Sequence, residues 1–111
     1  MSDCIFCRIV AGEIPGRKVF EDDELLAFHD VNPVAAVHVL IIPKRHVDSL
    51  AHCTVEDAAM LGRIQLLAVR LAAELGLEEG FKTVINTGKG GGQVVFHLHA
   101  HVLGGGKLSH V

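Results

Sequence analysis

The sequence contains no tryptophan and no tyrosine, and it has only 3 prolines among its 111 residues. It therefore lacks the side chains that most readily serve as stacking platforms for nucleic acid bases. Its 10 basic residues are outnumbered by 13 acidic ones, which gives a formal net charge of −3 and no basic stripe along the chain. These absences argue against a nucleic acid as the main partner.

Long apolar runs and the pattern of a secretion signal are also missing. The apolar run 39–43 is far shorter than the roughly 20 residues that a membrane-spanning helix needs. The first residues, Met-Ser-Asp-Cys, do not combine a basic segment with a following apolar stretch. We therefore expect no membrane partner and a cytoplasmic location.

Cysteine is scarce and odd in number, since the chain has 3. An odd count does not fit the disulfide framework of a small secreted protein. Cys4 and Cys7 form a Cys-x-x-Cys pair, which in a reducing compartment is more often a metal or redox element than a structural bridge. Cys53 stands alone and is expected to be a loop thiol.

The length fits one domain over residues 1–111, and half of the residues are hydrophobic. Helical spacing of apolar residues predicts a short helix over 4–11 and a long helix over 55–75, which begins with a capping box of Thr54 and Asp57. Strands are predicted at 18–21, 24–30, 37–42, 81–86 and 94–103. The result is an α+β domain in which a five-stranded antiparallel sheet carries the long helix on one face.

The long predicted helix has more apolar surface than one stripe. Met60 and Leu67 extend it beyond the residues that recur at helical spacing. A helix that is apolar on two sides usually contacts its own sheet and a second partner. We expect that partner to be the same helix of another copy, in a homodimer.

The chain has 8 histidines, and three of them occupy alternate positions: His97, His99 and His101. On a strand they would project from one face, roughly 7 Å apart, close enough for the imidazoles to converge on one small group. Imidazole titrates near neutral pH, so such a row can hold a neutral nucleophile beside a charged phosphate ligand. A solvated polar face is another interpretation. The glycine loop at 88–92 favours a phosphate or metal site instead.

The segment 92–103, Gly-Gln-Val-Val-Phe-His-Leu-His-Ala-His-Val-Leu, closely resembles the signature of the histidine-triad (HIT) family. Four further segments resemble the nucleotide-binding, phosphoramidase-like (HINT) branch of that family: 4–9, 27–33, 38–44 and 84–86. The resemblance implies the HIT-like fold and a homodimer whose sheets join into one continuous ten-stranded sheet. It also implies a purine nucleotide, of the AMP or GMP type, as the substrate.

The same resemblance implies catalytic roles for four histidines. His99 would be the nucleophile that forms a nucleotidyl-histidine intermediate, and His97 would complete the catalytic triad with His101. His38 would be a buried histidine that orients the nucleophile. Taken alone, a histidine in an apolar strand such as His38 is more often a satisfied core residue.

The resemblance also implies the residues that bind the nucleotide. The phosphate would be held by the side chains of His101 and Asn86 and by the backbone of Gly92, Gln93 and Val94. Asp30 would hold the ribose hydroxyls. The base pocket would consist of Ile5, Phe6, Ile9, Phe28, His29 and Val31. Without the resemblance, Asp30 reads as the cap of an Asx turn, Phe6 and Phe28 as core, and Asn86 as a turn residue.

Val94 departs from the family pattern, because many members of this branch carry serine there. A serine hydroxyl can form a hydrogen bond with the leaving-group atom, whereas valine keeps only its backbone N–H. The departure puts leaving-group activation in doubt, but it should not abolish nucleotide binding.

Cys4 and Cys7 provide half of the ligands of a tetrahedral zinc site. Some bacterial relatives resemble zinc proteins with the same start, and this likeness implies the ligand set Cys4, Cys7, His46 and His97. Zinc would then be structural, with no cofactor required for catalysis. The alternative is a pair of buried thiols on a short helix.

The leading hypothesis is hydrolysis of purine nucleoside 5′-monophosphoramidates or aminoacyl-adenylates through a nucleotidyl-histidine. Three alternatives stay open. They are dinucleoside polyphosphate hydrolysis, a nucleotide-binding regulator with weak catalysis, and a metal-binding module that uses all three histidines. The segment 4–10 and the short stretch after Leu103 favour the first hypothesis, whereas Val94 keeps the regulator possible.

Overall fold

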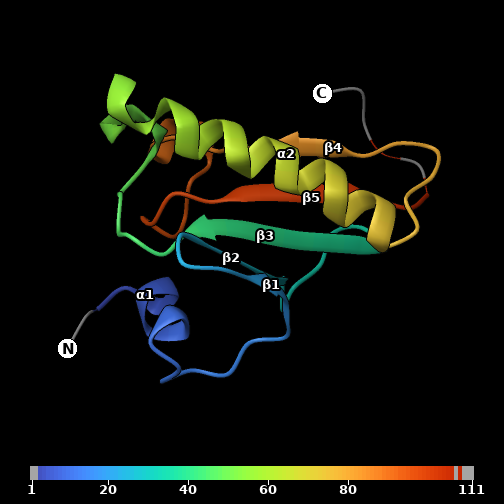
Figure 1. Ribbon diagram of the computed structural model, residues 1–111, viewed down its shortest axis with the longest axis horizontal. Helices are drawn as coiled ribbons and strands as arrows, with labels where there is room; N and C mark the ends of the chain where they lie inside the picture. Colours follow the sequence, from blue (N-terminus) through green and yellow to red (C-terminus); the bar gives the residue numbers. More distant parts are fainter. Residues whose placement is uncertain (1–2, 107, 109–111) are drawn as a thin grey trace.

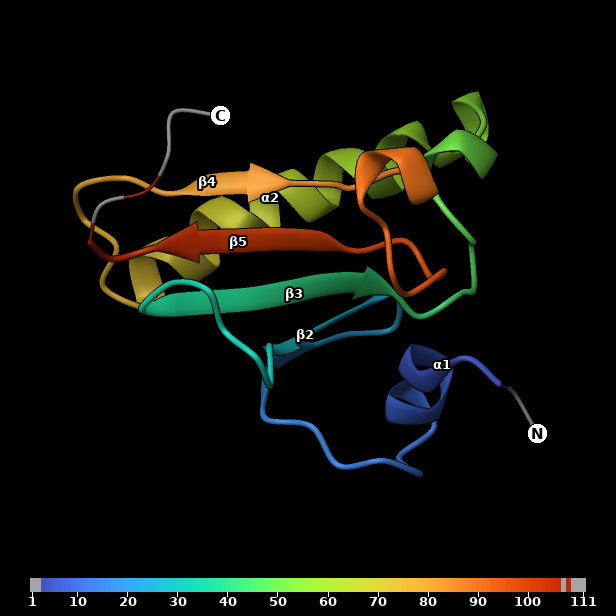
Figure 2. The same cartoon turned by 180° about the vertical axis from the view of Figure 1, so that it is seen from behind.

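The computed structural model describes residues 3–106 and 108. Its regular elements are α1 (Ile5–Val10), β1 (Lys18–Glu21), β2 (Leu25–His29), β3 (Val37–Pro43), α2 (Ala58–Glu74), β4 (Lys82–Val84) and β5 (Ala100–Gly104). The strands form one antiparallel sheet in the order β1-β2-β3-β5-β4. The long helix α2 lies across one face of the sheet (Figure 1), and the view from behind places the strands in front of it (Figure 2). The predicted α+β fold is confirmed.

Alternation along β2 and β3 decides which side chains meet which helix. Ala27 and Ile41 belong to the core between the sheet and α2. Phe28 and Leu40 belong to a second core on the opposite face, which the α1 residues Phe6 and Ile9 complete. Leu40 pairs with His101 across the β3–β5 ladder, so His101 lies on the α1 face. The histidines are therefore separated from α2 by the sheet.

The start of α2 agrees with the sequence, and its apolar faces differ from the prediction. Thr54 and Asp57 form the predicted capping box, although the first turn, Val55–Asp57, is a 3-10 helix. Met60 and Leu67 are 5% and 7% exposed, because both pack into the core of their own sheet. The prediction that these two residues face a partner chain is therefore wrong. The exposed apolar residues of α2 are instead Leu66 and Val69.

The last strand is shorter than predicted, because β5 begins at Ala100 and residues 94–99 lie outside the ladder. The neighbouring strand ends at Pro43, which has no N–H to continue the pairing. Leu98 instead donates its N–H to Val47 O at 2.7 Å. The β4 strand ends at Val84, which pairs with His101, the second residue of β5.

Side-chain alternation nevertheless continues outside the strand. Leu98 and Ala100 pack into the α2 core. The rings of His97 and His99 lie on the other side, where each makes an edge contact with Phe6. The alternation of side chains from His97 to Ala100 thus begins before the hydrogen-bonded ladder does.

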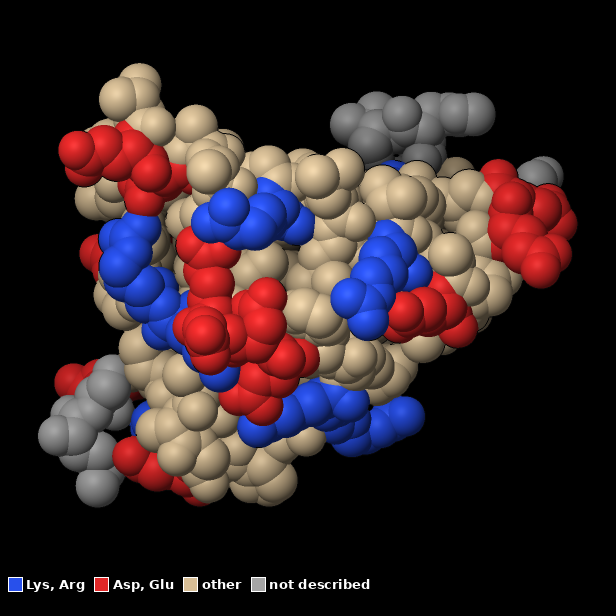
Figure 3. Space-filling model, in the orientation of Figure 1, with Lys and Arg blue, Asp and Glu red and all other residues tan. Residues whose placement is uncertain are grey.

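On the face that carries α2, Lys and Arg side chains are interspersed with Asp and Glu (Figure 3), and several form pairs such as Glu24 with Arg63. This face therefore offers no continuous basic surface. No helix in the described part of the chain combines the length and apolarity needed to span a membrane.

Candidate active site and metal centre

The three triad histidines lie in two different sites. His99 and His101 line a cavity of about 530 Å³ on the α1 face, which we call the histidine cavity. His97 does not line this cavity and is fully buried. Its ring belongs to a cluster with two cysteines. The prediction that three imidazoles surround one hollow is therefore wrong for His97.

His99 is held in one tautomer by the backbone. Its Nδ1 lies 2.7 Å from the carbonyl oxygen of His97, and the ring is 7% exposed. A carbonyl only accepts, so Nδ1 carries the hydrogen and Nε2 carries the lone pair. Phe6 packs edge-on against the ring, with centroids 5.2 Å apart. The backbone thus fixes the orientation of the imidazole and, in the neutral ring, leaves the lone pair on Nε2.

A second chain of hydrogen bonds sets the tautomer of His101. The N–H of Val34 donates to His38 Nδ1 at 3.1 Å, which leaves the hydrogen of a neutral His38 on Nε2. His38 Nε2 lies 2.9 Å from His101 Nδ1 and 3.3 Å from Asp30 Oδ2. If His38 donates to His101 Nδ1, His101 carries its own hydrogen on Nε2. His101 then faces the cavity as a donor.

The expectation that His38 orients the nucleophile is therefore corrected, because its ring contacts His101 and not His99. Sheet register gives the reason. Leu40 stands opposite His101, and His38 lies two residues along on the same face. His99 precedes the ladder and takes its partner from its own backbone.

Burial favours the neutral forms of His38, His97 and His101. It lowers the pKa of His38 and of His97 below the ordinary histidine value. It also lowers the pKa of His101 to about 4, with further lowering from the charges of His99 and His38. A buried imidazole loses hydration when it charges, so the neutral form dominates at pH 7.

The glycine loop is closed by its own hydrogen bonds. Gly92 has a left-handed φ of +88°, and its N–H donates to Lys89 O at 3.0 Å. The N–H of Gln93 donates to Gly88 O at 3.0 Å. These two N–H groups are therefore not free for a phosphate, contrary to the prediction. Among the described residues, the N–H of Val94 is the one of the predicted three that has no acceptor in the chain.

Gln93 holds the glycine loop in place through hydrogen bonds and does not line the histidine cavity. It is 5% exposed; its Oε1 accepts from Gly88 N–H, and its Nε2 donates to the carbonyls of Asp48 and Val95. Asn86 lines the cavity and donates to Gly91 O at 2.9 Å. A glutamine beside a glycine run could have indicated such a brace from the sequence.

The predicted base pocket comes together as one wall. All six of its residues line the histidine cavity, namely Ile5, Phe6, Ile9, Phe28, His29 and Val31. Sequence reasoning missed the turn of Pro15 and Gly16, and also Leu40. Side chains alternate along β3, so Leu40 lies on the same face as His38, and this pattern could have indicated Leu40 from the sequence.

Asp30 lies on the same cavity wall, and its carboxylate already has partners. Its Oδ1 accepts from the N–H of Asn32 at 2.8 Å, which is the Asx turn that its sequence context suggests. Its Oδ2 faces His38 Nε2. A carboxylate has further lone pairs, so this geometry leaves room for a hydroxyl donor.

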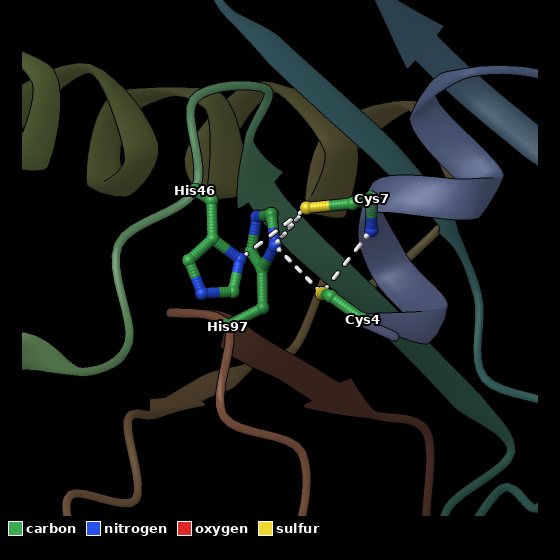
Figure 4. Close-up of side chains that lie close together, drawn as sticks. All are labelled: Cys4, Cys7, His46 and His97. Carbon is green, nitrogen blue, oxygen red and sulfur yellow. Dashed lines mark hydrogen bonds between the residues drawn. The ribbon is translucent and has the colours of Figure 1, made fainter. Parts of the chain in front are cut away.

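Cys4, Cys7, His46 and His97 form the predicted thiol–imidazole cluster (Figure 4), with ligand atoms within 4.8 Å of one another. Cys4 Sγ lies 3.3 Å from His97 Nδ1, and Cys7 Sγ lies 3.3 Å from His46 Nδ1 and 3.5 Å from His97 Nδ1. Tetrahedral zinc with ordinary bond lengths would hold S and N about 3.5 Å apart. One Nδ1 lone pair cannot accept straight hydrogen bonds from two thiols, so the convergence fits a shared metal ion.

Both imidazoles of the cluster have outer partners that leave Nδ1 unprotonated. His97 Nε2 donates to Pro43 O at 2.7 Å, and His46 Nε2 donates to Asp48 Oδ1 at 2.6 Å. Such contacts orient histidine ligands and raise their basicity. Asp48 was missed, although a carboxylate two residues after a candidate ligand is a usable signal.

Comparison with known proteins agrees with this geometry. A family model described as the HIT domain matches residues 11–108. The protein HitA of Neisseria gonorrhoeae is 55% identical over 104 residues, which cover 94% of this chain and 97% of HitA. The crystal structure of a HIT family hydrolase from Legionella pneumophila superposes with a TM-score of 0.95 at 44% identity, over 97% of each chain. The chain belongs to the histidine-triad family.

A further neighbour bears on the cluster. The structure of a Zn-bound histidine triad family protein from Mycobacterium smegmatis has a TM-score of 0.84 at 36% identity, over 97% of this chain and 81% of that one. The family membership and the Legionella neighbour support a hydrolase. The Mycobacterium neighbour shows that a protein of this fold can bind zinc.

Proposed function

We propose that this chain hydrolyses purine nucleoside 5′-monophosphoramidates or aminoacyl-adenylates, in the manner of the phosphoramidase-like branch. The observation that carries the proposal is the hydrogen bond from His99 Nδ1–H to the His97 carbonyl. In the neutral ring it leaves the lone pair on Nε2, and the ring lines a cavity that has both apolar and polar side chains. A neutral, oriented imidazole is what attack on phosphorus requires.

The reaction has two halves. In the first, the Nε2 lone pair of His99 forms a bond to phosphorus. In a phosphoramidate the P–N bond breaks with its electron pair leaving on the amine, which takes a proton from solvent; in an aminoacyl-adenylate the P–O bond to the acyl group breaks and its electron pair leaves on the carboxylate. The His97 carbonyl stabilises the resulting imidazolium through Nδ1–H. In the second, water adds to phosphorus, the P–Nε2 bond returns its electrons to His99, and one proton is lost to solvent.

The phosphoryl oxygens need donors in both halves. His101 supplies Nε2–H, and Val94 supplies its backbone N–H. Asn86 has a second amide hydrogen beyond the one that it gives to Gly91 O. Asp30 holds the ribose hydroxyls, and Phe6 and Phe28 contact the base.

The charge of the cavity favours phosphoramidates over dinucleoside polyphosphates. Among the described residues, no Lys or Arg lines the histidine cavity. Each additional phosphate of a polyphosphate would therefore enter without a cationic partner, which is costly where water is partly excluded. A regulator with weak catalysis differs only in rate, so kinetics separates it from the enzyme.

The test is turnover of adenosine 5′-phosphoramidate by the purified chain and by two histidine variants. We expect His99→Ala to lower kcat/KM by at least about 1,000-fold, because the nucleophile is removed. His52→Ala is the control, since His52 is exposed and lies outside the cavity and the cluster. Unchanged turnover in His99→Ala would refute the role of His99. Tight AMP binding without any turnover would identify a regulator.

We also propose that the thiol–imidazole cluster holds a structural zinc ion. The donor set and its spacing fit the metal. When bound, zinc would supply a rigid cross-link between α1 and the chain around His46 and His97. It does not take part in the chemistry at His99, for which no cofactor is required.

A homodimer is proposed as the assembly. Leu66 and Val69 are 70% and 55% exposed on the outer face of α2. β4 is an edge strand, and its Thr83 donates to Gln65 of α2, so edge and helix form one continuous surface. Two copies that join there would extend the sheet across both subunits, to ten strands, and would cover the exposed apolar side chains.

A further inference from the structure

A second hollow adjoins the histidine cavity beside Val94. Its volume is about 500 Å³, and we call it the Val94 groove. It is lined by Asp3, Cys4, Ile5, His46, Val94, Val95 and Phe96. Ile5, Val94 and Val95 line both hollows, so the two are neighbours that meet at these residues.

The wall of the groove is apolar and unusually exposed. Val94 is 86% exposed, Ile5 is 47% exposed and Phe96 is 40% exposed. Burial of these side chains by a ligand would therefore be favourable, at about fourfold in affinity for each buried methylene group of the ligand. These three residues line one hollow and so form a single apolar patch, unlike apolar residues that are scattered singly over a surface.

The charge of the groove excludes one kind of ligand. Among its described lining residues, Asp3 is the only one with a formal charge at neutral pH apart from the side chains of the thiol–imidazole cluster. No Lys or Arg lines it. A carboxylate or phosphate there would meet a like charge and no cation, so an anionic group is disfavoured.

The position of the groove relative to His99 indicates its occupant. Ile9 and Phe28 of the predicted base pocket line the histidine cavity alone, whereas Val94 lines both hollows. His99 and His101 line the same cavity, so a phosphorus atom held by them has its nucleoside toward Ile9 and Phe28. The substituent that is expelled then points toward Val94 and the groove.

We propose that the Val94 groove receives the leaving group and selects uncharged, apolar amines or aminoacyl groups over anionic ones, with Val94 as a specificity-determining residue. This inference rests on the proposed function. Valine offers the leaving group a surface to pack on but no side-chain hydrogen bond. Apolar packing of the leaving group against the groove thus replaces the hydrogen bond that a serine at this position could form with it.

The experiment compares adenosine 5′-phosphoramidates of two primary amines of similar basicity, phenethylamine and β-alanine. Their P–N bonds are chemically alike, and they differ in an aromatic ring against a carboxylate. We expect kcat/KM for the phenethyl compound to exceed that for the β-alanine compound by at least about tenfold, from burial of the ring and repulsion of the carboxylate. Equal values for the two compounds would overturn the inference.

Variants locate the effect in the groove. Val94→Thr keeps the branched shape and replaces one methyl group by a hydroxyl, and Phe96→Ala removes a ring from the wall. Each should reduce the preference for the phenethyl compound at least about threefold. Val55→Thr makes the same chemical change at a residue that is 91% exposed and lines neither hollow, and it should leave the preference unchanged. A preference that survives both groove variants would contradict the assignment.

Binding measurements distinguish a wrong inference about the groove from a wrong proposal about the reaction. Calorimetry with the His99→Ala variant measures the affinity for both compounds without turnover. If no compound is hydrolysed but the phenethyl compound binds more tightly and Val94→Thr removes the difference, the proposed reaction fails and the groove stands. If both compounds are hydrolysed but bind equally, the groove fails and the reaction stands.

Discussion

At the scale of single residues, His97 links the two sites without entering the histidine cavity. Its Nδ1 faces two sulfurs, its Nε2–H is held by Pro43 O, and its carbonyl holds His99. Three atoms of one residue thus fix the position of the cluster and the tautomer of the nucleophile. A substitution of His97 would disturb both at once, so variants at other positions are more informative.

Stability should decrease as the pH is lowered from about 7.5 to 5, in part because of His101. Its folded-state pKa of about 4 lies below the ordinary histidine pKa of 6.5, so in this range the unfolded chain takes up a proton that the folded chain does not. The contribution of His101 is about 2 kcal/mol over this interval. Urea unfolding of the wild type and of His101→Gln at both pH values measures it.

Comparing how the unfolding free energy of the variant and of the wild type changes with pH isolates the contribution of His101. His38 has a pKa lowered in the same direction by burial, so the variant should lose part of the pH dependence and not all of it. His52→Gln provides a control at an exposed histidine. Identical pH dependence in His101→Gln and the wild type would show that His101 is not buried in its neutral form.

Gly92 should be intolerant of a side chain, and Gly90 should not be. Gly92 has φ +88°, and an added Cβ would lie 3.5 Å from Asn86 Nδ2. Gly92→Ala should therefore cost about 1–2 kcal/mol of unfolding free energy and weaken AMP binding severalfold. Gly90 has an ordinary φ and no neighbour within 4 Å, so Gly90→Ala should change stability by less than about 0.5 kcal/mol. Equal effects of the two substitutions in thermal unfolding would refute this account of the loop.

The sequence predicted which residues share a face better than it predicted what each of them touches. Alternation placed Leu98 and Ala100 opposite His99, and the structure agrees even outside the strand. The sequence assigns His97 both to the catalytic triad and to the ligand set with the cysteines, and the structure places its ring with the cysteines. Alternation alone could not decide between the two sites, because the choice depends on where β3 ends and on residues far along the chain. The loop role of Gln93 likewise depends on Asp48, which is 45 residues away.

At the scale of elements, α1 is short, with 6 residues, and too short to be stable alone. Phe6 and Ile9 bury against the sheet, and Cys4 and Cys7 reach the cluster at the end of β3. The same helix places Ile5 and Phe6 on the cavity wall. The cluster therefore fixes one wall of the cavity by holding α1 in position.

Loss of a cluster ligand should release zinc and lower thermal stability. We expect the wild type, purified without chelators, to contain about one zinc per chain, and Cys7→Ser to contain less than half an equivalent. Tm should fall by at least about 5 °C in the variant, since binding energy that favours the folded state is lost. Cys53→Ser is the matched control, because Cys53 lies outside the cluster. Less than half an equivalent of zinc in the wild type would count against the site.

Element boundaries were predicted where a residue with a strong local effect stands at the end. Thr54 with Asp57 predicted the start of the long helix, and Pro43 predicted the end of β3. The predicted strand over 94–103 was too long at its beginning. Its apolar and β-branched residues favour extended backbone, but a strand also needs a partner, and Pro43 removes that partner.

At the scale of the whole molecule, the two faces of the sheet are used differently. The α1 face holds both the histidine cavity and the thiol–imidazole cluster. The α2 face holds the larger apolar core and the exposed residues Leu66 and Val69. Assembly through α2 would therefore leave the cavity open.

The dimer is tested by sedimentation at micromolar concentration. We expect the wild type to sediment as a dimer and Leu66→Lys to sediment as a monomer or a weakened dimer, because a charge would be buried at the interface. Glu56→Lys, at an exposed position in the 3-10 turn before α2, is the control for added positive charge. A monomeric wild type would reject the assembly.

The proposed reaction requires His99 to present its unprotonated Nε2 to a phosphorus atom in the histidine cavity. A crystal structure with bound AMP measures this directly. We expect His99 Nε2 to lie roughly 3–3.5 Å from phosphorus, with Nδ1 still bonded to the His97 carbonyl. A phosphate bound away from His99, or a His99 ring turned so that Nδ1 faces it, would contradict the claim.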